Sequence, residues 1–586
     1  MDILIQNGLV IDGTGKEPFP ANIGVKDGKI EYIGPGTYAA SRVIDASGQY
    51  VAPGFIDMHS HSDYTLPVYP NAESAIGQGV TTMVAGNCGM SPSPCPNFYL
   101  PFCFEEAAMA RVLPEPIGGV NPGFMQMCHP ALLRPHYQAL FGTDLDWTSF
   151  SEYAAHLRRA GIAPNLIAMV GHGTIRCQAM GADIHRAATP AEIEEMVRLC
   201  DRAMQEGAAG VSFGLDYDPG GYADDAELEA IASCVARHGK ILTTHYQLRP
   251  VRRGVTTEHS TVDGILEMLR LAKRTGVHLH LSHMTASFTI KPYDRELERL
   301  SVLRVLEIIE SYRADGVYVT YDTIPSYTGG DFFYPNIAQR FLPYVLQAGG
   351  MERFSQALRT GNYKEMLIDD ICAGKHASSS VMTYLNPVTM PNWGAGAMIT
   401  RCADRSLEGK TIGELCRTSG KNHVRLLLDI LSQDPYACYN MWSGQAPGVD
   451  TEVFLSTPDM AIGMDVSSVD YTLRGSFDDD RPQNKRSTGT YCCFIKYLSS
   501  GRQPIEDLVR HLTSVPADIL HLADRGRIAQ GNVADITVFD AQKLRANEDF
   551  LEPARRPDGI SHVLVGGKLA MEQGIHTHIR SGSVII

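Results

Sequence analysis

The 586-residue sequence lacks any apolar run that approaches the roughly 18 residues needed to span a bilayer. Its first residues, MDILIQNGLVIDG, also lack the basic stretch ahead of an apolar one that a secretory signal requires. We therefore expect a protein that has no membrane partner and stays in the cytoplasm.

The sequence also has few basic residues and no paired cysteine motif, and both features limit its partners and its compartment. Lys and Arg number 51 against 66 Asp and Glu, so the net charge of -15 offers no basic footprint for nucleic acid. The 13 cysteines include no CxxC pair, and this scatter is typical of reduced thiols in a cytoplasm. We expect a small-molecule substrate as the partner, and a homo-oligomer is compatible with the same composition.

Eight short apolar segments in the middle of the chain alternate with amphipathic stretches. They are GFIDMHSH from Gly54, TTMVAG from Thr81, NLIAMVGH from Asn165, GVSFGL from Gly210, KILTTHY from Lys240, HLHLSHM from His278, VYVTYDT from Val317 and MAIGMD from Met460. Helical periods between them cover Pro190–Glu206, Asp263–Arg274 and Leu300–Tyr312. Alternating strands and helices predict a parallel sheet, and eight such units predict an α/β fold, a (β/α)8 TIM barrel over residues 53–526.

The remaining segments predict insertions and a second domain. Segments 89–164 and 325–459 interrupt the repeat, and we expect them over the barrel mouth as lids, substrate walls or oligomer contacts. Both chain ends, residues 1–52 and 527–586, contain short strands separated by turns. Because neither end can bury a good sheet alone, we expect them to pair into one small β-sandwich domain.

Five residues at the predicted strand ends have side chains that zinc prefers. His59 and His61 alternate along the first strand, so both imidazoles point to one side, and Cys88 follows the second strand between glycines. His245 and His283 end the fifth and sixth strands. Because the carboxyl ends of barrel strands meet at the mouth, we predict a metal centre with one or two Zn²⁺ ions, and Cys88 is a candidate bridge between two ions.

Asp465, which ends the eighth apolar segment, is the predicted general base. A zinc ion lowers the pKa of a water molecule that it binds to about 7, and a nearby carboxylate can take the proton and return it to the leaving group. Asp459 and Asp470 compete for this role, but they lie before and after the strand end. His172 and Arg176, in GHGTIR after the third strand, are candidates for polarising a carbonyl or binding an anion, or they only support the loop.

The sequence resembles the amidohydrolase superfamily, and more narrowly the N-acyl-D-amino-acid deacylase (D-aminoacylase) family, over nearly its whole length. The resemblance is carried by VAPGFIDMHSHSD, GVTTMVAGNCG, VGHGTIR, GVSFGLDYDPG, the His of TTHY, the His of LSHM, LTSVPADILHLADRGRIAQGNVADITVFD and GISHVLVGGK. It implies a catalytic aspartate at Asp465 and a β-sandwich built from both chain ends. It also implies two metal positions, a tight one held by Cys88, His245 and His283 and a weaker one at His59 and His61.

Four positions depart from the pattern of that family. The lysine that follows its sixth-strand histidine and helps to hold the substrate carboxylate is absent from the run His283-Met284-Thr285. The other three departures are Asp322-Thr323-Ile324-Pro325 in place of a tyrosine-bearing segment, Met464-Asp465-Val466 in place of Ser-Asp-Gly, and His245-Tyr246-Gln247-Leu248-Arg249 in place of HxRxE. Arg486, in KRSTGT, lies where the family has an arginine near the substrate, so we predict that Arg486, with Arg249 or Arg176, binds an anionic group of an altered substrate.

The sequence thus predicts a zinc-dependent hydrolase that cleaves an amide C–N bond outside a peptide chain, in an N-acyl-D-amino acid or a related small molecule. The alternative is an enzyme of the same superfamily that opens a cyclic amide, imide or lactone, or that deaminates its substrate. A non-catalytic barrel scaffold would lack ligands, whereas the five ligand candidates and the aspartate are all present.

Overall fold

The computed structural model describes residues 1–100, 127, 129–181, 183–216, 219–247, 262–285, 294–325, 336–373, 378–379, 382–385, 393–441, 449–471, 492–547, 549 and 555–586. Arg249 and Arg486 lie outside these residues. Within the described ranges, none of the helices combines the length and the apolar character that crossing a membrane demands.

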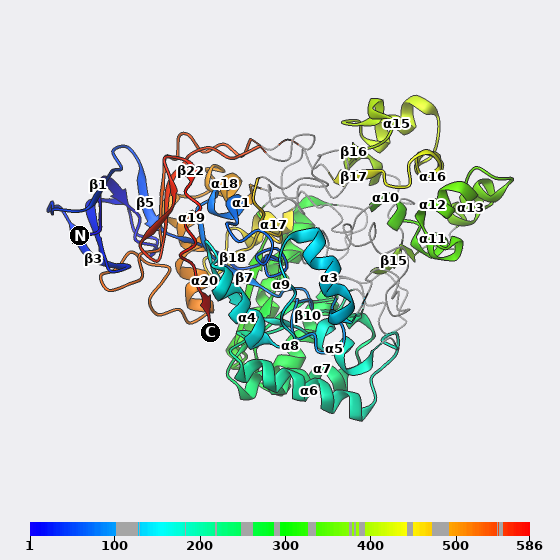
Figure 1. Ribbon diagram of the computed structural model, residues 1–586, viewed down its shortest axis with the longest axis horizontal. Coiled ribbons are helices and arrows are strands. Elements are labelled where there is room, and N and C mark those ends of the chain that lie inside the picture. Colours follow the sequence, from blue (N-terminus) through cyan, green and yellow to red (C-terminus); the bar gives the residue numbers. More distant parts are fainter. Residues whose placement is uncertain are drawn as a thin grey trace.

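Strands from both chain ends form one nine-stranded sheet, drawn in blue and red in Figure 1. They are β1 (Ile3–Val10), β2 (Phe19–Lys26), β3 (Lys29–Gly34), β4 (Arg42–Asp45), β5 (Tyr50–Pro53), β19 (Ile536–Phe539), β20 (Ile560–Val565), β21 (Lys568–Glu572) and β22 (Ile575–His576). The two ends join where β5 pairs antiparallel with β19, with Val51 opposite Val538. Apolar residues of both ends, among them Ile23 and Leu564, are fully buried in one shared core. Each end thus buries side chains that it could not bury alone.

Each of the eight apolar segments of the middle region contains strand residues. The strands are β6 (Phe55–Asp57), β7 (Val80–Ala85), β8 (Asn165–Ala168), β9 (Val170–Gly171), β10 (Gly210–Gly214), β11 (Ile241–His245), β12 (His278–Leu281), β13 (Val319–Thr323) and β18 (Ala461–Ile462). All pair in parallel, in the orders β8-β7-β6 and β18-β13-β12-β11-β10-β9, and only Met169 separates β8 from β9. The last strand, β23 (Val584–Ile585), is not part of the sheet of the chain ends. It pairs in parallel with β8 and so extends the sheet that β8, β7 and β6 form.

Backbone hydrogen bonds also bring the first and the eighth of these segments together. Met58 N donates to Ile462 O at 3.1 Å, and Asp465 N donates to His59 O at 2.7 Å. A parallel bridge between Ser60 and Val466 continues the contact. The residues that follow β6 and β18 therefore lie side by side.

Helices that connect the parallel strands pack against one another in chain order. The contacts join α5 to α6, α6 to α7, α7 to α8, and α8 to α9. These helices are α5 (His172–Met180), α6 (Pro190–Gln205), α7 (Asp225–Arg237), α8 (Val262–Thr275) and α9 (Arg295–Ala314), so the three helices expected from the sequence are present. Local sequence explains the start of α6, where Thr189 and Glu192 form a capping box around Pro190. Other helices outside the long insertion are α1 (Glu73–Ile76), α3 (Pro130–Phe141), α4 (Phe150–Ala160), α18 (Cys493–Leu498), α19 (Ile505–Leu512) and α20 (Ser514–Ile519).

The second insertion has a hydrophobic core of its own, which includes Phe341, Phe354 and Leu427. Its elements are α10 (Asn336–Gln339), α11 (Leu342–Ala348), α12 (Met351–Ala357), α13 (Tyr363–Cys372), β14 (Ser378–Ser379), β15 (Met382–Leu385), α14 (Trp393–Gly396), β16 (Ala397–Arg401), α15 (Ile412–Ser419), α16 (His423–Gln433), β17 (Cys438–Met441) and α17 (Val449–Phe454). Most of them lie at the end of the molecule opposite the sheet of the chain ends in Figure 1, whereas α17 packs against α9.

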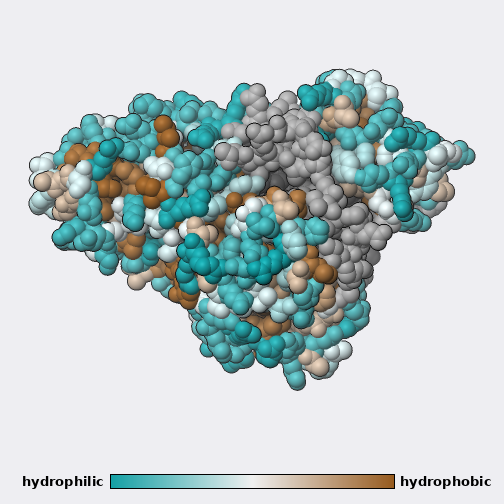
Figure 2. Space-filling view, viewed as in Figure 1, coloured by the Kyte–Doolittle hydropathy of each residue, from teal (hydrophilic) through white to brown (hydrophobic). Residues whose placement is uncertain are grey.

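On the face that Figure 2 shows, the coloured surface is mainly hydrophilic, but hydrophobic residues gather over the sheet of the chain ends, at the left. Large hydrophobic residues exposed on this sheet include Leu9, Phe19, Val43 and Ile575.

Candidate metal centre

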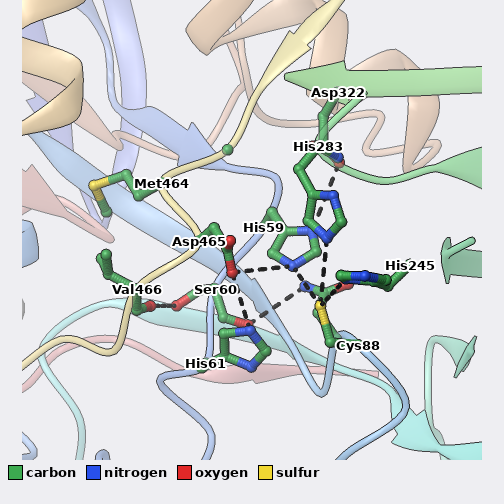
Figure 3. Close-up of polar contacts among 12 residues, drawn as sticks. His59, Ser60, His61, Cys88, His245, His283, Asp322, Met464, Asp465 and Val466 are labelled. Carbon is green, nitrogen blue, oxygen red and sulfur yellow. Dashed lines mark hydrogen bonds and ion pairs between the residues drawn. The ribbon is translucent and has the colours of Figure 1, made fainter. Parts of the chain in front are cut away.

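Six side chains predicted from the sequence meet where the parallel strands end (Figure 3). They are His59, His61, Cys88, His245, His283 and Asp465. Their donor atoms form two groups in which all atoms lie within 4.8 Å of one another. One group contains His59, His61, Cys88 and Asp465, and the other contains Cys88, His245 and His283. Cys88 belongs to both groups.

The Cys88 sulfur lies at the centre of the cluster. Its Sγ is 3.3 Å from His59 Nε2, 3.5 Å from His283 Nε2 and 3.8 Å from His245 Nδ1. Burial would raise the pKa of the Cys88 thiol, but the charge of His59 and hydrogen bonds from the other two imidazoles lower it well below its ordinary value. Cys88 is therefore poised as a thiolate, the form in which cysteine binds metals.

The Asp465 carboxylate faces the two histidines of the first strand. Its Oδ1 is 3.1 Å from His61 Nε2 and 3.6 Å from His59 Nε2. Burial would lower the pKa of His61, yet hydrogen bonds to Asp465 and Cys88 raise it to about 9. Burial likewise opposes a charged His59, whose pKa nevertheless lies well above its ordinary value because of Cys88, Asp322 and Asp465. The negative groups of the cluster thus favour cations at this position.

Three donors of the cluster have left-handed backbone conformations although none is glycine. The φ angles are 55° at Cys88, 36° at His283 and 53° at Asp465. This conformation is uncommon for residues with a Cβ, and such outliers concentrate at functional sites. Glycine is needed next to Cys88, because a Cβ at Gly89 would lie only 2.7 Å from Gly214 N.

Three buried aspartates hold the donors from behind. Asp322 on β13 accepts hydrogen bonds from His283 N at 2.8 Å and His280 Nε2 at 2.7 Å, and it lies 3.8 Å from His59 Nδ1. Asp57 accepts from Met464 N at 2.9 Å, next to Asp465, and Asp216 Oδ2 is 3.8 Å from His245 Nε2. Carboxylates placed behind a ligand imidazole fix its tautomer and orientation. Sequence reasoning did not assign these roles, although the position of Asp216 and Asp322 at strand ends was a usable signal.

His172 and Arg176 are buried on α5, and both pair with Glu227 of α7, which is not a donor of the cluster. His172 Nε2 is 2.6 Å from Glu227 Oε1, and the Arg176 guanidinium donates to Glu227 Oε2. All three side chains are 0% exposed. The alternatives to Asp465 also lie apart: Asp459 pairs with Arg313, and Asp470 accepts from Asn71 Nδ2 at 2.9 Å.

The donor set of the cluster fits zinc. One thiolate, four imidazoles and one carboxylate are the ligand types that zinc accepts, in groups of three or four. The shared sulfur fits two adjacent ions as well as one. With 12% of its side chain exposed, His245 is more accessible than His59 and His61, of which 0% and 2% are exposed.

Comparison with known sequences finds relatives that match along the whole chain. The sequence model of the amidohydrolase family matches residues 42–305 and 496–571. An N-acyl-D-glutamate deacylase of Alcaligenes xylosoxydans xylosoxydans is 29% identical over 598 residues, covering 100% of this chain and 96% of that protein. A D-aminoacylase of the same organism is 27% identical over 589 residues, covering 100% of this chain and 97% of the relative.

Solved structures give the same neighbours. The crystal structure of a D-aminoacylase matches with a TM-score of 0.68 at 26% identity, covering 100% of this chain and 99% of the other. An N-acyl-D-glutamate deacylase from Bordetella bronchiseptica, solved with zinc and a phosphonate that mimics the tetrahedral intermediate, matches with a TM-score of 0.68 at 25% identity and the same coverage.

Proposed function

Because the chain belongs to the amidohydrolase family, we propose that it is a zinc-dependent hydrolase that cleaves the amide C–N bond of an N-acyl-D-amino acid or a related small molecule. The observation that carries this proposal is the sharing of Cys88 by two donor groups, one of which includes Asp465. Full-length similarity to two deacylases supports the same reaction.

In this proposal, Cys88, His245 and His283 would hold one zinc ion, and His59 and His61 would hold a second. Bound zinc would polarise the scissile carbonyl and make a water molecule acidic enough to attack it near neutral pH. Asp322 and Asp216 keep the ligand imidazoles in place through the contacts described above.

Asp465 is the proposed general base and acid. Its Oδ1 faces His59 and His61, so the carboxylate lies beside the position where the attacking water must be held. It takes the proton from this water and delivers it to the amide nitrogen, which leaves as a free amine. The other product is a carboxylate. Arg249 and Arg486 stay the proposed partners of an anionic substrate group.

The experiment is turnover of matched N-acyl-D- and N-acyl-L-amino acids by zinc-loaded protein, with the products identified by mass. Acyl derivatives of glutamate, aspartate and leucine cover acidic and apolar side chains, and Asp465→Asn protein controls for contaminating hydrolases. Release of free D-amino acid by wild-type protein alone supports the proposal. Hydrolysis of the L-enantiomers alone, or of neither series, contradicts it.

Ring opening is the second candidate. A segment of 90 residues, which is 15% of this chain, is 48% identical to part of a D-hydantoinase of Rhizobium radiobacter. The panel therefore includes hydantoins and cyclic imides. A product that is heavier than its substrate by one water molecule, without a second fragment, would select this alternative over deacylation.

We also propose a domain division. Residues 53–526 form a closed (β/α)8 barrel with insertions at 89–164 and 325–459, and residues 1–52 and 527–586 form a β-sandwich domain, apart from β23, which pairs with β8 of the barrel. Hydrogen bonds between the residues after β6 and β18 support closure, and the shared core of the chain ends supports the second domain. Limited proteolysis tests this division, because the first cuts should fall near the boundaries at residues 52 and 526 or within the insertions.

Location and assembly complete the proposal. The described cysteines form no disulfide with one another, which supports a reducing cytoplasm, and cell fractionation tests this location. Exposed Leu9, Val43 and Ile575 on the sheet of the chain ends support a contact in a homo-oligomer. Light scattering gives the mass in solution, and a monomer mass would contradict the oligomer.

A further inference from the structure

A second cluster of metal-binding side chain types lies between α6 and α7, which run along the lower edge of Figure 1. Asp201 belongs to α6, Cys234 belongs to α7, and His238 caps the C-terminus of α7. One donor atom of each residue lies within 4.8 Å of the other two. His238 Nε2 is 2.8 Å from Asp201 Oδ1.

The helical spacing explains why these side chains converge. Cys234 and His238 are four residues apart, and His238 keeps a right-handed helical backbone with a φ of -87°. Residues at this spacing lie on the same face of a helix. Because α6 and α7 pack against each other, that face meets Asp201 and its neighbour Cys200.

The three donors of the cluster differ in burial. Cys234 is completely buried, whereas 22% of the His238 side chain and 41% of the Asp201 side chain are exposed. The sulfur is fixed inside by a hydrogen bond from the Cys200 thiol, and it lies 3.9 Å from Val197 O. Gln205 Nε2 donates to Asp201 Oδ2 at 2.6 Å and so orients the carboxylate, with Oδ1 toward His238. The imidazole and the carboxylate are therefore the solvent-facing donors of the cluster, and the sulfur is the buried one.

We propose that Asp201, Cys234 and His238 bind one zinc ion that links α6 to α7, separately from the centre at the ends of the parallel strands. Sulfur, imidazole nitrogen and carboxylate oxygen are the three zinc donor types, and water or Cys200 can fill a fourth tetrahedral position. An interhelical ion pair between Asp201 and His238 would not need a thiol within 4.8 Å of both. The role of this ion is structural, so it is independent of the proposed deacylase activity.

The first test measures the zinc content of full-length protein after equilibration with Zn²⁺ and gel filtration. His238→Gln and Asp201→Asn change partly exposed positions, and each should lose about one zinc per chain relative to wild type while turnover stays unchanged. His156→Gln is the control, because it breaks the His156 to Asp146 pair, which belongs to none of the metal-binding groups among the described residues. Equal zinc content in wild-type, His238→Gln and Asp201→Asn proteins would overturn the proposal.

The second test identifies the sulfur with Co²⁺ as the probe. In Cys88→Ala protein, the thiolate of the first centre is gone, so a remaining thiolate-to-Co²⁺ absorption band must come from another cysteine. We expect such a band, and we expect Cys234→Ser to remove it from the Cys88→Ala protein. Absence of the band in Cys88→Ala protein, its persistence after Cys234→Ser, or a Cys200–Cys234 disulfide in anaerobically purified protein would each refute the site.

Discussion

Glu227→Gln should destabilise the protein strongly although it changes one atom type in one side chain. Glu227 is 0% exposed and accepts hydrogen bonds from both His172 and Arg176, which are equally buried. Burial would raise the pKa of Glu227, but its two partners hold it below its ordinary value, so the group is a carboxylate at neutral pH. The amide of Gln keeps the shape and removes the charge. The Arg176 guanidinium would then remain buried without a counter-charge.

The magnitude follows from the burial of the pair. Breaking a fully buried ion pair by removing one partner costs about 3–5 kcal/mol, because the remaining charge has neither water nor a counter-ion. Replacing both charges with apolar groups removes that penalty, so Arg176→Met with Glu227→Leu should recover part of the loss. Recovery should stay incomplete, because Arg176 also donates to the carbonyls of Ile184 and Arg186, and each such bond contributes about 1 kcal/mol.

The assay is urea denaturation at a fixed excess of zinc, so that metal binding stabilises all variants equally. A loss below about 1 kcal/mol for Glu227→Gln would refute the argument, because exposed ion pairs lie in that range. The same variants test the substrate role that the sequence suggested for Arg176. If Arg176 binds substrate, the conservative Arg176→Lys should raise KM; an unchanged KM with a lowered stability assigns Arg176 to the support of α5 and α7.

Three further predictions concern the metal centre and a buried histidine. Asp465→Asn should lower kcat by about 10²–10⁴-fold with zinc retained at Cys88, His245 and His283, and turnover close to wild type would move the base to another residue. Cys88→Ala should lose zinc at both positions by elemental analysis, whereas Cys177→Ala, a buried cysteine outside both donor groups, should keep it. Burial lowers the pKa of His511 from 6.5 to about 4, so the unfolded chain binds the proton first as the pH falls. The stability present above pH 6.5 should therefore decrease by about 3 kcal/mol towards pH 4, and denaturation at several pH values should show a flatter profile for His511→Gln.

The parallel strands and the donor cluster could be predicted from the sequence because both follow from one rule. Parallel strands are buried and apolar, so a polar residue at the end of such a strand has a reason to be there. The eight apolar segments all contain strands, and the structure brings together the six donors found at their ends, from His59 to Asp465.

The same rule cannot tell a strand end from the first turn of the next helix. His172 directly follows β9, much as His245 is the last residue of β11, yet α5 begins at His172 itself. Arg176 lies four residues later on the same helical face, and this face meets Glu227 of α7. The separate core of the second insertion was equally hidden, because Phe341, Phe354 and Leu427 carry no periodic signal that assigns them to one unit.

Cys88, His283 and Asp465 have strained backbone conformations at the site. Each lies two or three residues beyond the end of its strand and has a left-handed φ, which disfavours residues with a Cβ by about 1–2 kcal/mol each. Glycine would relieve this strain, so the side chains at these positions must contribute more than their backbone costs. Hydrogen bonds impose the conformation: Asp465 N donates to His59 O, and His283 N donates to Asp322 Oδ1. The first bond holds the proposed base against a ligand of one donor group, and the second holds a ligand of the other. The relative position of base and ligands is therefore set by hydrogen bonds from the backbone amides of Asp465 and His283.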